Sequence, residues 1–537
     1  MAQASGGRES WGSRLGVILA VTGSAVGLGN FLRFPGLAAK YDGGAFMIPY
    51  FTAFLLLGLP ICWIEWSMGR YGGARGFNSS PGIYRAIWRS RAAPYFGVLS
   101  MIIPVMIYMY YVYVEAWCLA YAGFYLSGKM ELGNNARAYK DLFDTFIGKD
   151  GDGSAFFNAK GGLFDSVLIY LVICFVLNFT LIYRGLTKGI EWFCKLAMPA
   201  LIVCAFIVLA RVLTLGTPNP ALPEQNLLNG LGYMWNPATE QTGFLESLGN
   251  PQMWLEAAGQ IFFSLSVGFG IIITYASYLK KDDDIALSGL TAASGNEFCE
   301  VALGGMITIP AAFVFLGSTF LMDEQGKEVG TFGLGFVTLP NVFNQMYAGQ
   351  FVGFVFFFLL FLAALTSSLS MLQPAIALLE EGLGLGRKAS VALLGFITAM
   401  GAGFVVYFSK GLTAMDTIDF WVGTFGIYVL AMFQVFLFVW ALGVDRGFQE
   451  LDRGAEIRIP RFFRFVVMYL TPLYLLAIFV AWCGKQLSEG GMVAMTFQNP
   501  VAAMSVGFIA VVAALFALLI SQSVRRWRAM ERKGGES

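Results

Sequence analysis

Runs of about 20 apolar residues recur along the whole chain, and each run is long enough to form a helix that crosses a lipid bilayer. Short polar segments separate the runs and leave no stretch over for a soluble domain. The pattern therefore predicts an all-α polytopic membrane protein of about twelve transmembrane helices. The expected helices lie near residues 15–38, 44–70, 94–127, 164–184, 190–214, 252–279, 286–317, 347–381, 388–409, 419–444, 462–486 and 499–524.

Two of these runs, the first and the sixth, are interrupted by nearly the same four-residue sequence. VGLG occupies residues 26–29 and VGFG occupies residues 267–270. Each Gly weakens a helix by about 1 kcal/mol relative to Ala, and backbone groups freed inside the membrane must find new partners. Such a matched pair is expected of a transporter that is built from two repeated halves and has its site at the breaks. Close helix packing through glycine is the alternative explanation.

Basic residues set the expected orientation, because cytoplasmic loops carry an excess of Lys and Arg. The loop after the second run, the C-terminal tail and the N-terminus are all basic. We expect a multi-pass protein of a cell membrane, a bacterial inner membrane, with both termini cytoplasmic. The residues concerned are Arg70, Arg75, Arg85, Arg89, Arg91, Arg525, Arg526, Arg528, Arg532, Lys533, Arg8 and Arg14.

Composition narrows the classes of function. Of 537 residues, 57% are hydrophobic and 13% are charged, against about 25% charged residues in soluble domains. The formal net charge of +1 gives no reason to expect a nucleic-acid partner. The chain has no histidine, and its seven cysteines form no close pair of metal-binding type. Because a nucleophile–base set and a phosphate-binding lysine loop are also missing, we expect neither an enzyme nor an ATP-driven machine.

Polar side chains inside the apolar runs are the remaining candidates for function, because an ionisable group at mid-membrane costs at least about 2.5 kcal/mol. Oxygen ligands without histidine or thiolate suit a hard cation, and the lack of a full carboxylate cage favours a monovalent one such as Na⁺. Alternatively, the hydroxyls of residues 366–368 bond only to carbonyls one turn earlier. The candidates are Arg33, Glu65, Glu115, Glu297, Glu300, Asp419, Asn30, Tyr111, Ser264, Ser266, Asn296, Thr366, Ser367 and Ser368.

Several of these residues stand in longer motifs that resemble the neurotransmitter:sodium symporter family, and among its members the bacterial leucine transporter. The motifs are SAVGLGNFLRFP (24–35), GGAFMIPY (43–50), IEW (64–66), QIFFSLSVGFG (260–270), LTSS (365–368) and DFW (419–421). The resemblance runs from about Arg8 to Arg528. It implies one transporter domain over 1–537, with inverted five-helix repeats at about 12–214 and 252–444. Helices 1 and 6 would be broken, and two peripheral helices would span about 462–524.

The resemblance implies two sodium ions. One would be held by the Ala25 backbone, the side chains of Asn30, Ser264 and Asn296, and the carboxylate of the substrate. The other would be held by carbonyls of Gly23, Val26 and Ala363 with the hydroxyls of Thr366 and Ser367. Unwound backbone can supply such oxygens where no water competes, and half-helix N-termini face the anionic group of the substrate.

The resemblance also implies the class of substrate. Gly27 stands where monoamine transporters of the family carry an Asp, so the substrate should bring its own carboxylate and be an amino acid. The implied side-chain pocket contains no charge, and burying an unpaired charge costs several kcal/mol. We therefore expect a neutral, mainly apolar L-amino acid. The implied substrate-binding residues are Ala25, Leu28, Gly29, Ile107, Tyr111, Phe263, Ser264, Ser266, Phe269, Ser367 and Met371.

Two gates follow from the same resemblance. The outer gate would be Arg33 with Asp419, and the inner gate would be Arg8 with Glu381, a Glu where the family usually has Asp. Tyr111 and Phe269 would lie beneath the outer gate, and Trp11, Ser277 and Tyr278 near the inner one.

Glu300 stands where chloride-dependent members carry a small neutral residue. A carboxylate there supplies the negative charge that chloride would bring near the sodium, which predicts chloride-independent transport. A Glu that is paired only structurally within the bundle is the alternative.

The expected function is sodium-coupled symport by alternating access. A sensor of the same fold that binds an amino acid and transports nothing is the alternative. The expected partners are a small-molecule amino acid, sodium ions and the lipid bilayer, and a homodimer is left open.

Overall fold

The computed structural model describes residues 9–41, 43–157, 165–236, 243–322, 326–487 and 492–535. Within these ranges all regular structure is helical, apart from one isolated bridge between Met322 and Glu328. Short π-helical or 3-10 turns extend or join many of the α-helices. The α-helices are α1 (Arg14–Ala25), α2 (Phe34–Lys40), α3 (Met47–Ala53), α4 (Leu59–Gly73), α5 (Ser80–Ile87), α6 (Ala93–Leu126), α7 (Ala136–Phe146), α8 (Ser154–Phe157), α9 (Val167–Tyr183), α10 (Trp192–Leu213), α11 (Leu227–Trp235), α12 (Phe244–Leu248), α13 (Pro251–Leu265), α14 (Ile271–Ala276), α15 (Ile285–Glu297), α16 (Met306–Leu316), α17 (Gly330–Gly333), α18 (Leu339–Asn344), α19 (Gly349–Ala377), α20 (Arg387–Tyr407), α21 (Thr413–Ile418), α22 (Ile427–Phe436), α23 (Val444–Asp452), α24 (Phe462–Phe465), α25 (Thr471–Leu487), α26 (Met492–Gln498) and α27 (Pro500–Gly535).

Most of these helices belong to membrane-spanning segments. In the described ranges, nine helical segments are long and apolar enough to cross a membrane, and the bent pair Arg14–Ala25 and Gly29–Lys40 makes a tenth. The two other predicted spans fall on α9, which has 17 residues, and on the interrupted pair α13 and α14. The prediction of an all-helical polytopic membrane protein is confirmed. The boundaries of the two inverted repeats stay a prediction.

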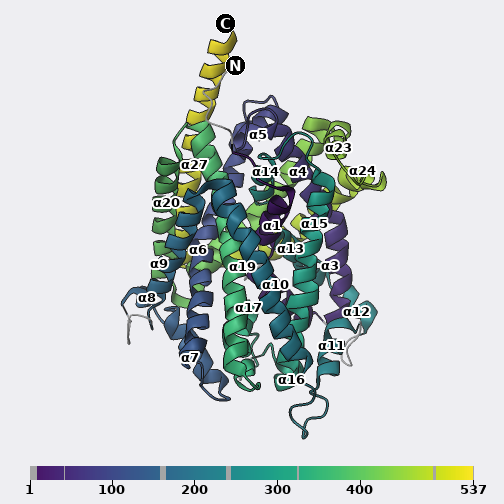
Figure 1. The fold of residues 1–537 in the computed structure, drawn as a ribbon, viewed down its shortest axis with the longest axis vertical. Coiled ribbons are helices and arrows are strands. Elements are labelled where there is room, and N and C mark those ends of the chain that lie inside the picture. The colour runs from purple at the N-terminus through teal and green to yellow at the C-terminus, as the bar shows by residue number, and fades with distance from the viewer. Residues whose placement is uncertain are drawn as a thin grey trace.

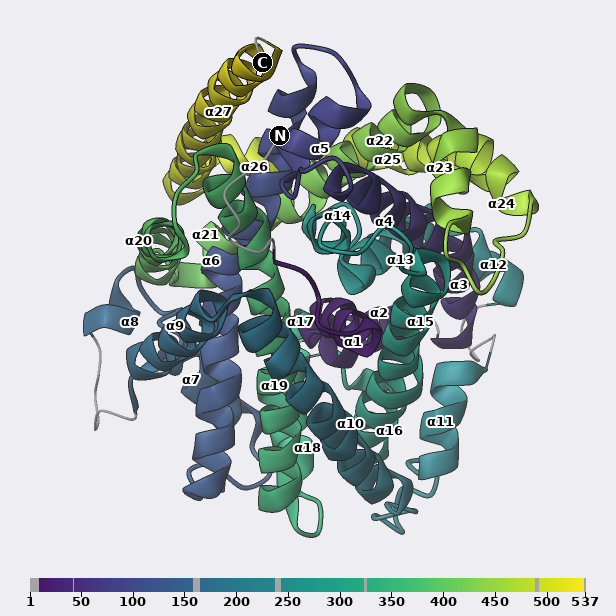
Figure 2. The same cartoon turned by 45° about the horizontal axis from the view of Figure 1, so that its top comes forward.

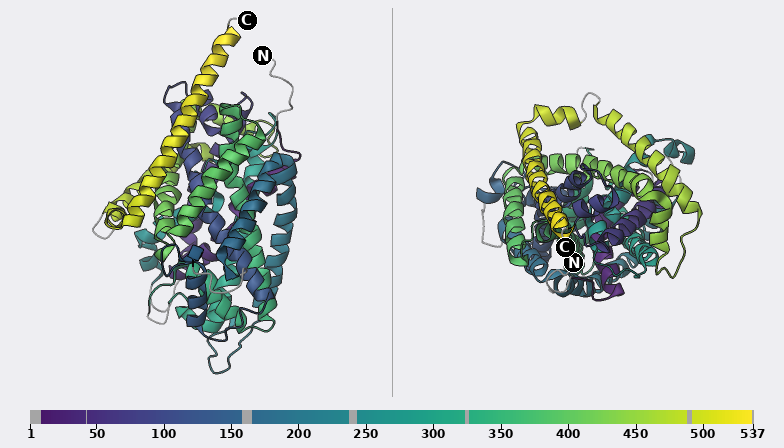
Figure 3. Two further views of the ribbon diagram at one scale, coloured as in Figure 1. Left: turned by 90° about the vertical axis from the view of Figure 1, so that its left-hand side faces the viewer. Right: turned by 90° about the horizontal axis from the view of Figure 1, so that it is seen from above.

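The chain that leads into α1 and the end of α27 lie toward the same end of the molecule (Figure 1). The last helix, α27, runs along the outside of the bundle and extends beyond the other helices at that end (Figure 3).

The first helix lies in the middle of the bundle, surrounded by other helices (Figure 2). Its chain breaks where the sequence predicts, because Val26 has an extended conformation (φ −71°, ψ 104°) and a new helical turn begins at Gly29. The two halves are bent by 50° relative to each other. The break takes the N–H groups of Gly27 and Leu28 out of helical hydrogen bonding, and they donate to the side chains of Asn30 and Tyr111 instead.

The second break separates α13 from α14. Three residues there, Ser266, Gly268 and Gly270, have left-handed backbone conformations, with φ of 54°, 75° and 82°. Left-handed geometry is unfavourable for residues with a Cβ, which explains the two glycines. Both predicted breaks are therefore present.

Two long helices, α6 and α19, pack against each other and form the wall that faces the breaks. Aromatic rings interlock between them, as in the pair Tyr121 and Phe357, whose ring centroids are 4.9 Å apart. Gly353 allows this close approach, because a Cβ there would lie 2.2 Å from the Tyr125 ring. Small residues at helix contacts are typical of membrane proteins, in which van der Waals packing drives association.

The geometry of the second break predicts that replacing Gly270 lowers the stability of the protein. A Cβ at this position would lie 2.8 Å from the Ser100 carbonyl oxygen, in addition to the left-handed φ of 82°. Gly270→Ala should lower the unfolding free energy by about 1–2 kcal/mol or more, read as a lower melting temperature of the purified protein in detergent. The control is Gly403→Ala within α20, where a Cβ meets nothing within 4 Å and helix propensity improves. Equal melting temperatures for the two variants would contradict this account of the break.

Candidate functional site

A cluster of buried polar side chains lies beside the two breaks, and Glu300 is at its centre. Its Oε1 accepts a hydrogen bond from Gln260 Nε2 at 2.7 Å, and its Oε2 accepts from Asn30 Nδ2 at 3.2 Å and from the Ser264 hydroxyl. The Asn30 and Asn296 amide groups lie 2.9 Å apart, and the Asn296 amide is also 3.3 Å from the carbonyls of Ala25 and Ser264. The four residues of the first implied sodium site thus converge in space.

The charge of this cluster is not balanced by a basic side chain. Glu300 is fully buried, and no Lys or Arg in the described part of the chain lies within 4.0 Å of its carboxylate. Glu297, one turn earlier, accepts a hydrogen bond from the Tyr50 hydroxyl at 2.6 Å. A buried charge is costly unless it is paired. The arrangement therefore suits a bound cation.

A second group of oxygens surrounds the Ser367 hydroxyl, between α19 and the end of α1. The hydroxyl lies 3.0 Å from the carbonyl of Ala363 and 3.2–3.3 Å from three carbonyls of the first break. Because a hydroxyl has one hydrogen, it can satisfy only one of these four acceptors. The Ser24 and Ala363 carbonyls have other donors, the hydroxyls of Ser266 and Thr366. The Gly23 and Val26 carbonyls are left to share the one Ser367 hydrogen, an oxygen-rich arrangement that suits a second cation. The three carbonyls are those of Gly23, Ser24 and Val26.

Thr366 lies beside this group. Its hydroxyl donates to the carbonyls of Leu362 at 3.1 Å and Ala363 at 3.0 Å, one turn earlier in α19. This back-bonding is what the alternative interpretation of the triplet predicts. Ser367 in addition reaches the first break, so the structure brings together all five residues of the second implied sodium site.

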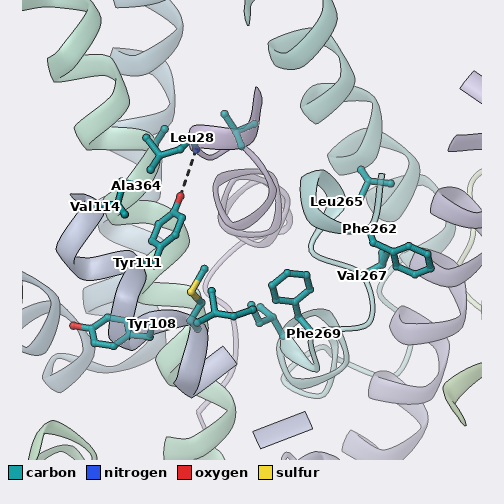
Figure 4. Close-up of a cluster of buried hydrophobic side chains, with 14 of the residues drawn as sticks. Leu28, Tyr108, Tyr111, Val114, Phe262, Leu265, Val267, Phe269 and Ala364 are labelled. Carbon is teal, nitrogen blue, oxygen red and sulfur yellow. Dashed lines mark hydrogen bonds between the residues drawn. The ribbon is translucent and has the colours of Figure 1, made fainter. Parts of the chain in front are cut away.

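Tyr111 on α6 lies opposite the first break. Its hydroxyl accepts a hydrogen bond from the backbone N–H of Leu28 at 3.4 Å, and Figure 4 shows the two groups facing each other while Tyr108 turns away. Ser266, in the second break, donates to the Ser24 carbonyl at 3.0 Å and so ties the two breaks together. The Phe263 and Phe269 rings meet edge to face, with centroids 6.2 Å apart.

The space beside Gly27 is narrow. A Cβ there would lie 2.9 Å from the Tyr111 hydroxyl and 3.1 Å from Ser367 Oγ. A Cβ on Gly29 would lie 3.2 Å from the Phe263 ring. The remaining residues of the implied substrate pocket, Ile107 and Met371, are buried.

A cavity of about 180 Å³ lies next to these residues and contains the implied outer gate. Arg33 and Asp419 both line this cavity. Among the described residues, the two side chains do not come within 4.0 Å of each other and so form no ion pair. Asp419 instead accepts a hydrogen bond from the Tyr110 hydroxyl at 2.6 Å, and the Arg33 guanidinium lies 5.4 Å from the centre of the Phe263 ring. The pair that would close the cavity is thus open in this conformation.

At the end where the chain enters α1, the residues of the implied inner gate are packed together. The Trp11 side chain is buried, and its indole N–H donates to the Tyr275 carbonyl at 2.9 Å. Ser277 donates to the Thr274 carbonyl at 2.6 Å, and Tyr278 accepts from Gln373 Nε2 at 3.0 Å.

The expected partner of Glu381, Arg8, lies outside the described residues. Glu381 itself accepts hydrogen bonds from the backbone N–H of Ser79 at 2.8 Å and from the Ser79 hydroxyl at 3.2 Å. The pairing of Arg8 with Glu381 stays a prediction.

Sequence reasoning did not single out two groups that hold the start of the chain. Buried Glu191 accepts from the Gly12 N–H at 2.7 Å and from the Ser13 hydroxyl at 2.9 Å. Arg387 lies 3.7 Å from Glu9 and 3.3 Å from Glu380. The sequence showed only that Glu191 is an acidic residue at the start of an apolar run. Its partners could not be recognised, because they lie 178 and 179 residues away along the chain.

Comparison with known proteins places this site in a family. The model of the Sodium:neurotransmitter symporter family matches residues 8–143 and 162–529. An uncharacterised sodium-dependent transporter of Methanocaldococcus jannaschii is 27% identical over 485 residues, which cover 90% of this chain and 92% of the relative. The sodium-dependent serotonin transporter of Drosophila melanogaster is 26% identical over 88% of this chain and 76% of the relative.

Among solved structures, the crystal structure of MhsT in complex with L-phenylalanine has the same fold. It matches with a TM-score of 0.73 and 26% sequence identity, over 88% of this chain and 100% of MhsT. Relatives named for different substrates match at similar identities. Overall similarity therefore gives the class of protein and leaves the substrate to the residues of the site.

The packing of Trp11 predicts how the end near α1 is kept closed. Trp11→Ala removes a hydrogen bond and a ring contact with Tyr275 at 5.1 Å, each of which contributes about 1 kcal/mol. A Cys introduced at Ser277 should then react with a maleimide about tenfold faster, in a background in which the two less buried cysteines, Cys204 and Cys483, are replaced by Ser. The control is Trp192→Ala, which removes an exposed Trp. Unchanged labelling in Trp11→Ala would show that this contact does not control access.

Proposed function

The chain belongs to the sodium:neurotransmitter symporter family, and we propose that it is a sodium-coupled symporter of neutral, mainly apolar L-amino acids that works by alternating access and does not require chloride. The family and the named relatives make it a sodium-dependent transporter. The proposal adds the substrate, the ion sites and the independence from chloride.

The observation that carries the proposal is the convergence of two oxygen clusters on the two helix breaks. One cluster contains Asn30, Ser264 and Asn296 around the unpaired carboxylate of Glu300, and the other surrounds the Ser367 hydroxyl. Oxygen ligands without histidine or thiolate suit a hard cation such as Na⁺. In the first cluster the substrate carboxylate would complete the ligand set, which couples the ion to the substrate.

The narrow space at Gly27 supports an amino acid as the substrate. A larger side chain at this position would collide with the Tyr111 hydroxyl. The protein therefore offers no carboxylate here to pair with the amine of a substrate, and the carboxylate should be part of the substrate itself. Its carboxylate would meet the backbone N–H groups of Leu28 and Gly29, and Tyr111. Its amine would meet carbonyls of Ala25, Phe263 and Ser264 and the Ser266 hydroxyl. The crystal structure of MhsT with L-phenylalanine supports a neutral amino acid of this kind.

The arrangement of the two ends supports alternating access. The cavity with Arg33 and Asp419 is open between these residues, whereas Trp11 and its neighbours are packed at the other gate. With both termini cytoplasmic, this is an outward-facing conformation. Sodium and substrate would enter through the cavity, and the ion pair would close behind them.

The shared ion site predicts coupling between sodium and substrate. Since each completes the site of the other, binding of one should strengthen binding of the other. Replacing Na⁺ by K⁺ should abolish concentrative amino-acid uptake into proteoliposomes, and Asn30→Ala and Thr366→Val should raise the sodium concentration for half-maximal uptake about tenfold.

The matched control for Thr366→Val is Thr398→Val. Thr398 in α20 is also buried and also donates to the carbonyl four residues earlier, that of Leu394, at 2.8 Å. It lies in neither cluster, so its loss should leave the sodium response unchanged. Undiminished uptake in sodium-free buffer would end the proposal, and sodium-dependent binding without uptake would instead identify an amino-acid sensor.

The Glu300 carboxylate predicts independence from chloride, because it already supplies a fixed negative charge beside the first ion site. Uptake should be equal in chloride and gluconate buffers. Glu300→Ser should make uptake depend on chloride, measured as the ratio of initial rates in the two buffers. A wild-type protein that requires chloride would refute this role of Glu300.

The pocket predicts which compounds compete. Ile107, Met371 and the rings of Phe263 and Phe269 offer no charge to a substrate side chain. Neutral, mainly apolar L-amino acids should compete for uptake of a labelled amino acid, whereas lysine, glutamate, dopamine and serotonin should not, because an unpaired buried charge costs several kcal/mol. Strong competition by glutamate or by a monoamine would show that the pocket takes a different substrate.

A further inference from the structure

A buried polar network lies on the face of α19 that points away from the first break. It consists of Ser368 on α19, Asn178 on α9 and Glu115 on α6, and all three side chains are fully buried. None of the three contacts the substrate or an ion in the proposed transport mechanism. Polar groups of this kind are rare in a membrane interior and mark function more often than packing.

Asn178 is the centre of this network. Its Nδ2 donates to both oxygens of the Glu115 carboxylate, at 3.1 and 3.2 Å, and to the Cys174 carbonyl at 3.0 Å. Its Oδ1 accepts from the Ser368 hydroxyl at 2.8 Å. Against an ionised carboxylate only the NH₂ group can donate, which favours this orientation of the amide. The amide therefore joins α6, α9 and α19.

The link to the second ion site runs through neighbouring residues of α19. Successive residues of a helix are about 100° apart around its axis, so Ser367 faces the first break when Ser368 faces α9. The Ser367 hydroxyl sits among the carbonyls of the break at 3.2–3.3 Å. A rotation of α19 that lengthens the bond from Ser368 to Asn178 also moves the Ser367 hydroxyl and its neighbour Thr366.

The other end of the network is fixed to the helix that carries Tyr111. Glu115 and Tyr111 are four residues apart on α6 and therefore share a face. Tyr111 contacts the Leu28 N–H in the first break, at 3.4 Å. The same face of α6 thus sets the position of the break directly and the position of α19 through Asn178. The first break and α19, which form the two sides of the proposed second ion site, are thus both attached to α6.

We propose that Asn178 is a positioning residue for the second sodium site: it holds Ser368 against Glu115 and thereby fixes the rotation of α19 at which Thr366 and Ser367 meet the carbonyls of the first break. The inference rests on the proposed function, because it assumes that sodium binds there. Neutral oxygens bind sodium weakly, so the ion cannot pull a displaced helix back into position. The distances between the oxygens must therefore be set by residues around the site.

The test compares the sodium response of variants that break or keep the link. Ser368→Ala removes the hydroxyl, Asn178→Ala removes the amide, and Ser368→Thr keeps a hydroxyl at the same place. Initial uptake of a labelled neutral amino acid into proteoliposomes is measured against sodium concentration at saturating amino acid. The half-activating sodium concentration should rise about tenfold in the two Ala variants and stay within about twofold of wild type in Ser368→Thr.

A role in helix packing alone predicts a different result. It would lower melting temperature and maximal rate and leave the half-activating sodium concentration unchanged. The matched control is Ser505→Ala on α27, where the lost hydroxyl is also buried and donates to the carbonyl of Val501, at 2.8 Å. This variant should keep the wild-type sodium response. If Asn178→Ala does not fold, Ser368→Ala, the smaller change, decides the question.

The outcomes distinguish a failure of the proposed function from a failure of the role assigned to Asn178. A wild-type protein without sodium-dependent uptake overturns the proposed function and this inference with it. A sodium-dependent wild type together with a wild-type sodium response in Ser368→Ala overturns the inference alone. A raised half-activating concentration in Ser368→Ala with recovery in Ser368→Thr supports both.

Discussion

The structure depends on one constraint, namely that backbone groups freed inside a membrane must be satisfied by protein or by ligand. The first and sixth apolar segments each break near the middle of the segment, and the breaks take backbone groups of residues 26–28 and 266–270 out of regular helical hydrogen bonding. The surrounding helices meet this demand in part, for example through the Tyr111 hydroxyl at Leu28 and the Ser266 hydroxyl at the Ser24 carbonyl. The carbonyls that remain around Ser367 outnumber the hydrogens available. The same feature that costs stability thus leaves oxygens in an arrangement that suits a cation.

Electrostatics divides the site into two unlike halves. The first cluster contains the buried carboxyl group of Glu300, held by Gln260, Ser264 and Asn30 and without a basic side chain nearby in the described structure. The second cluster contains only neutral oxygens. A fixed charge binds a cation through attraction, whereas neutral oxygens bind it only when their spacing is right. If sodium binds there as proposed, the second half relies more on the exact packing of α19, and the network behind Ser368 sets that packing.

The two ends of the site are in opposite states in this conformation. The Trp11 indole is buried and bonded to the Tyr275 carbonyl, and Glu191 and Arg387 hold the chain that precedes α1. At the cavity, Arg33 and Asp419 bind other partners, a ring and a tyrosine hydroxyl. Each end thus has discrete partners that can be exchanged, which is what a two-state gate requires. The central helices α6 and α19 interlock through aromatic rings and provide the rigid frame for these exchanges.

The sequence by itself determined the membrane class, the position of the apolar spans and both breaks, because length, hydropathy and glycine placement are local signals on which a bilayer imposes helical structure. It did not predict the helices between the spans, such as α7 and α11. Its motifs also named the residues of the two oxygen clusters, which the structure brings together. Only the tertiary structure decided which polar groups meet: Asn30 with Asn296, Ser368 with Asn178, and Glu191 with Gly12, pairs separated by 266, 190 and 179 residues. In a uniformly apolar helix, hydropathy does not specify which face turns inward. Rotation is set by packing against neighbouring helices, and that information lies in no single segment of the chain.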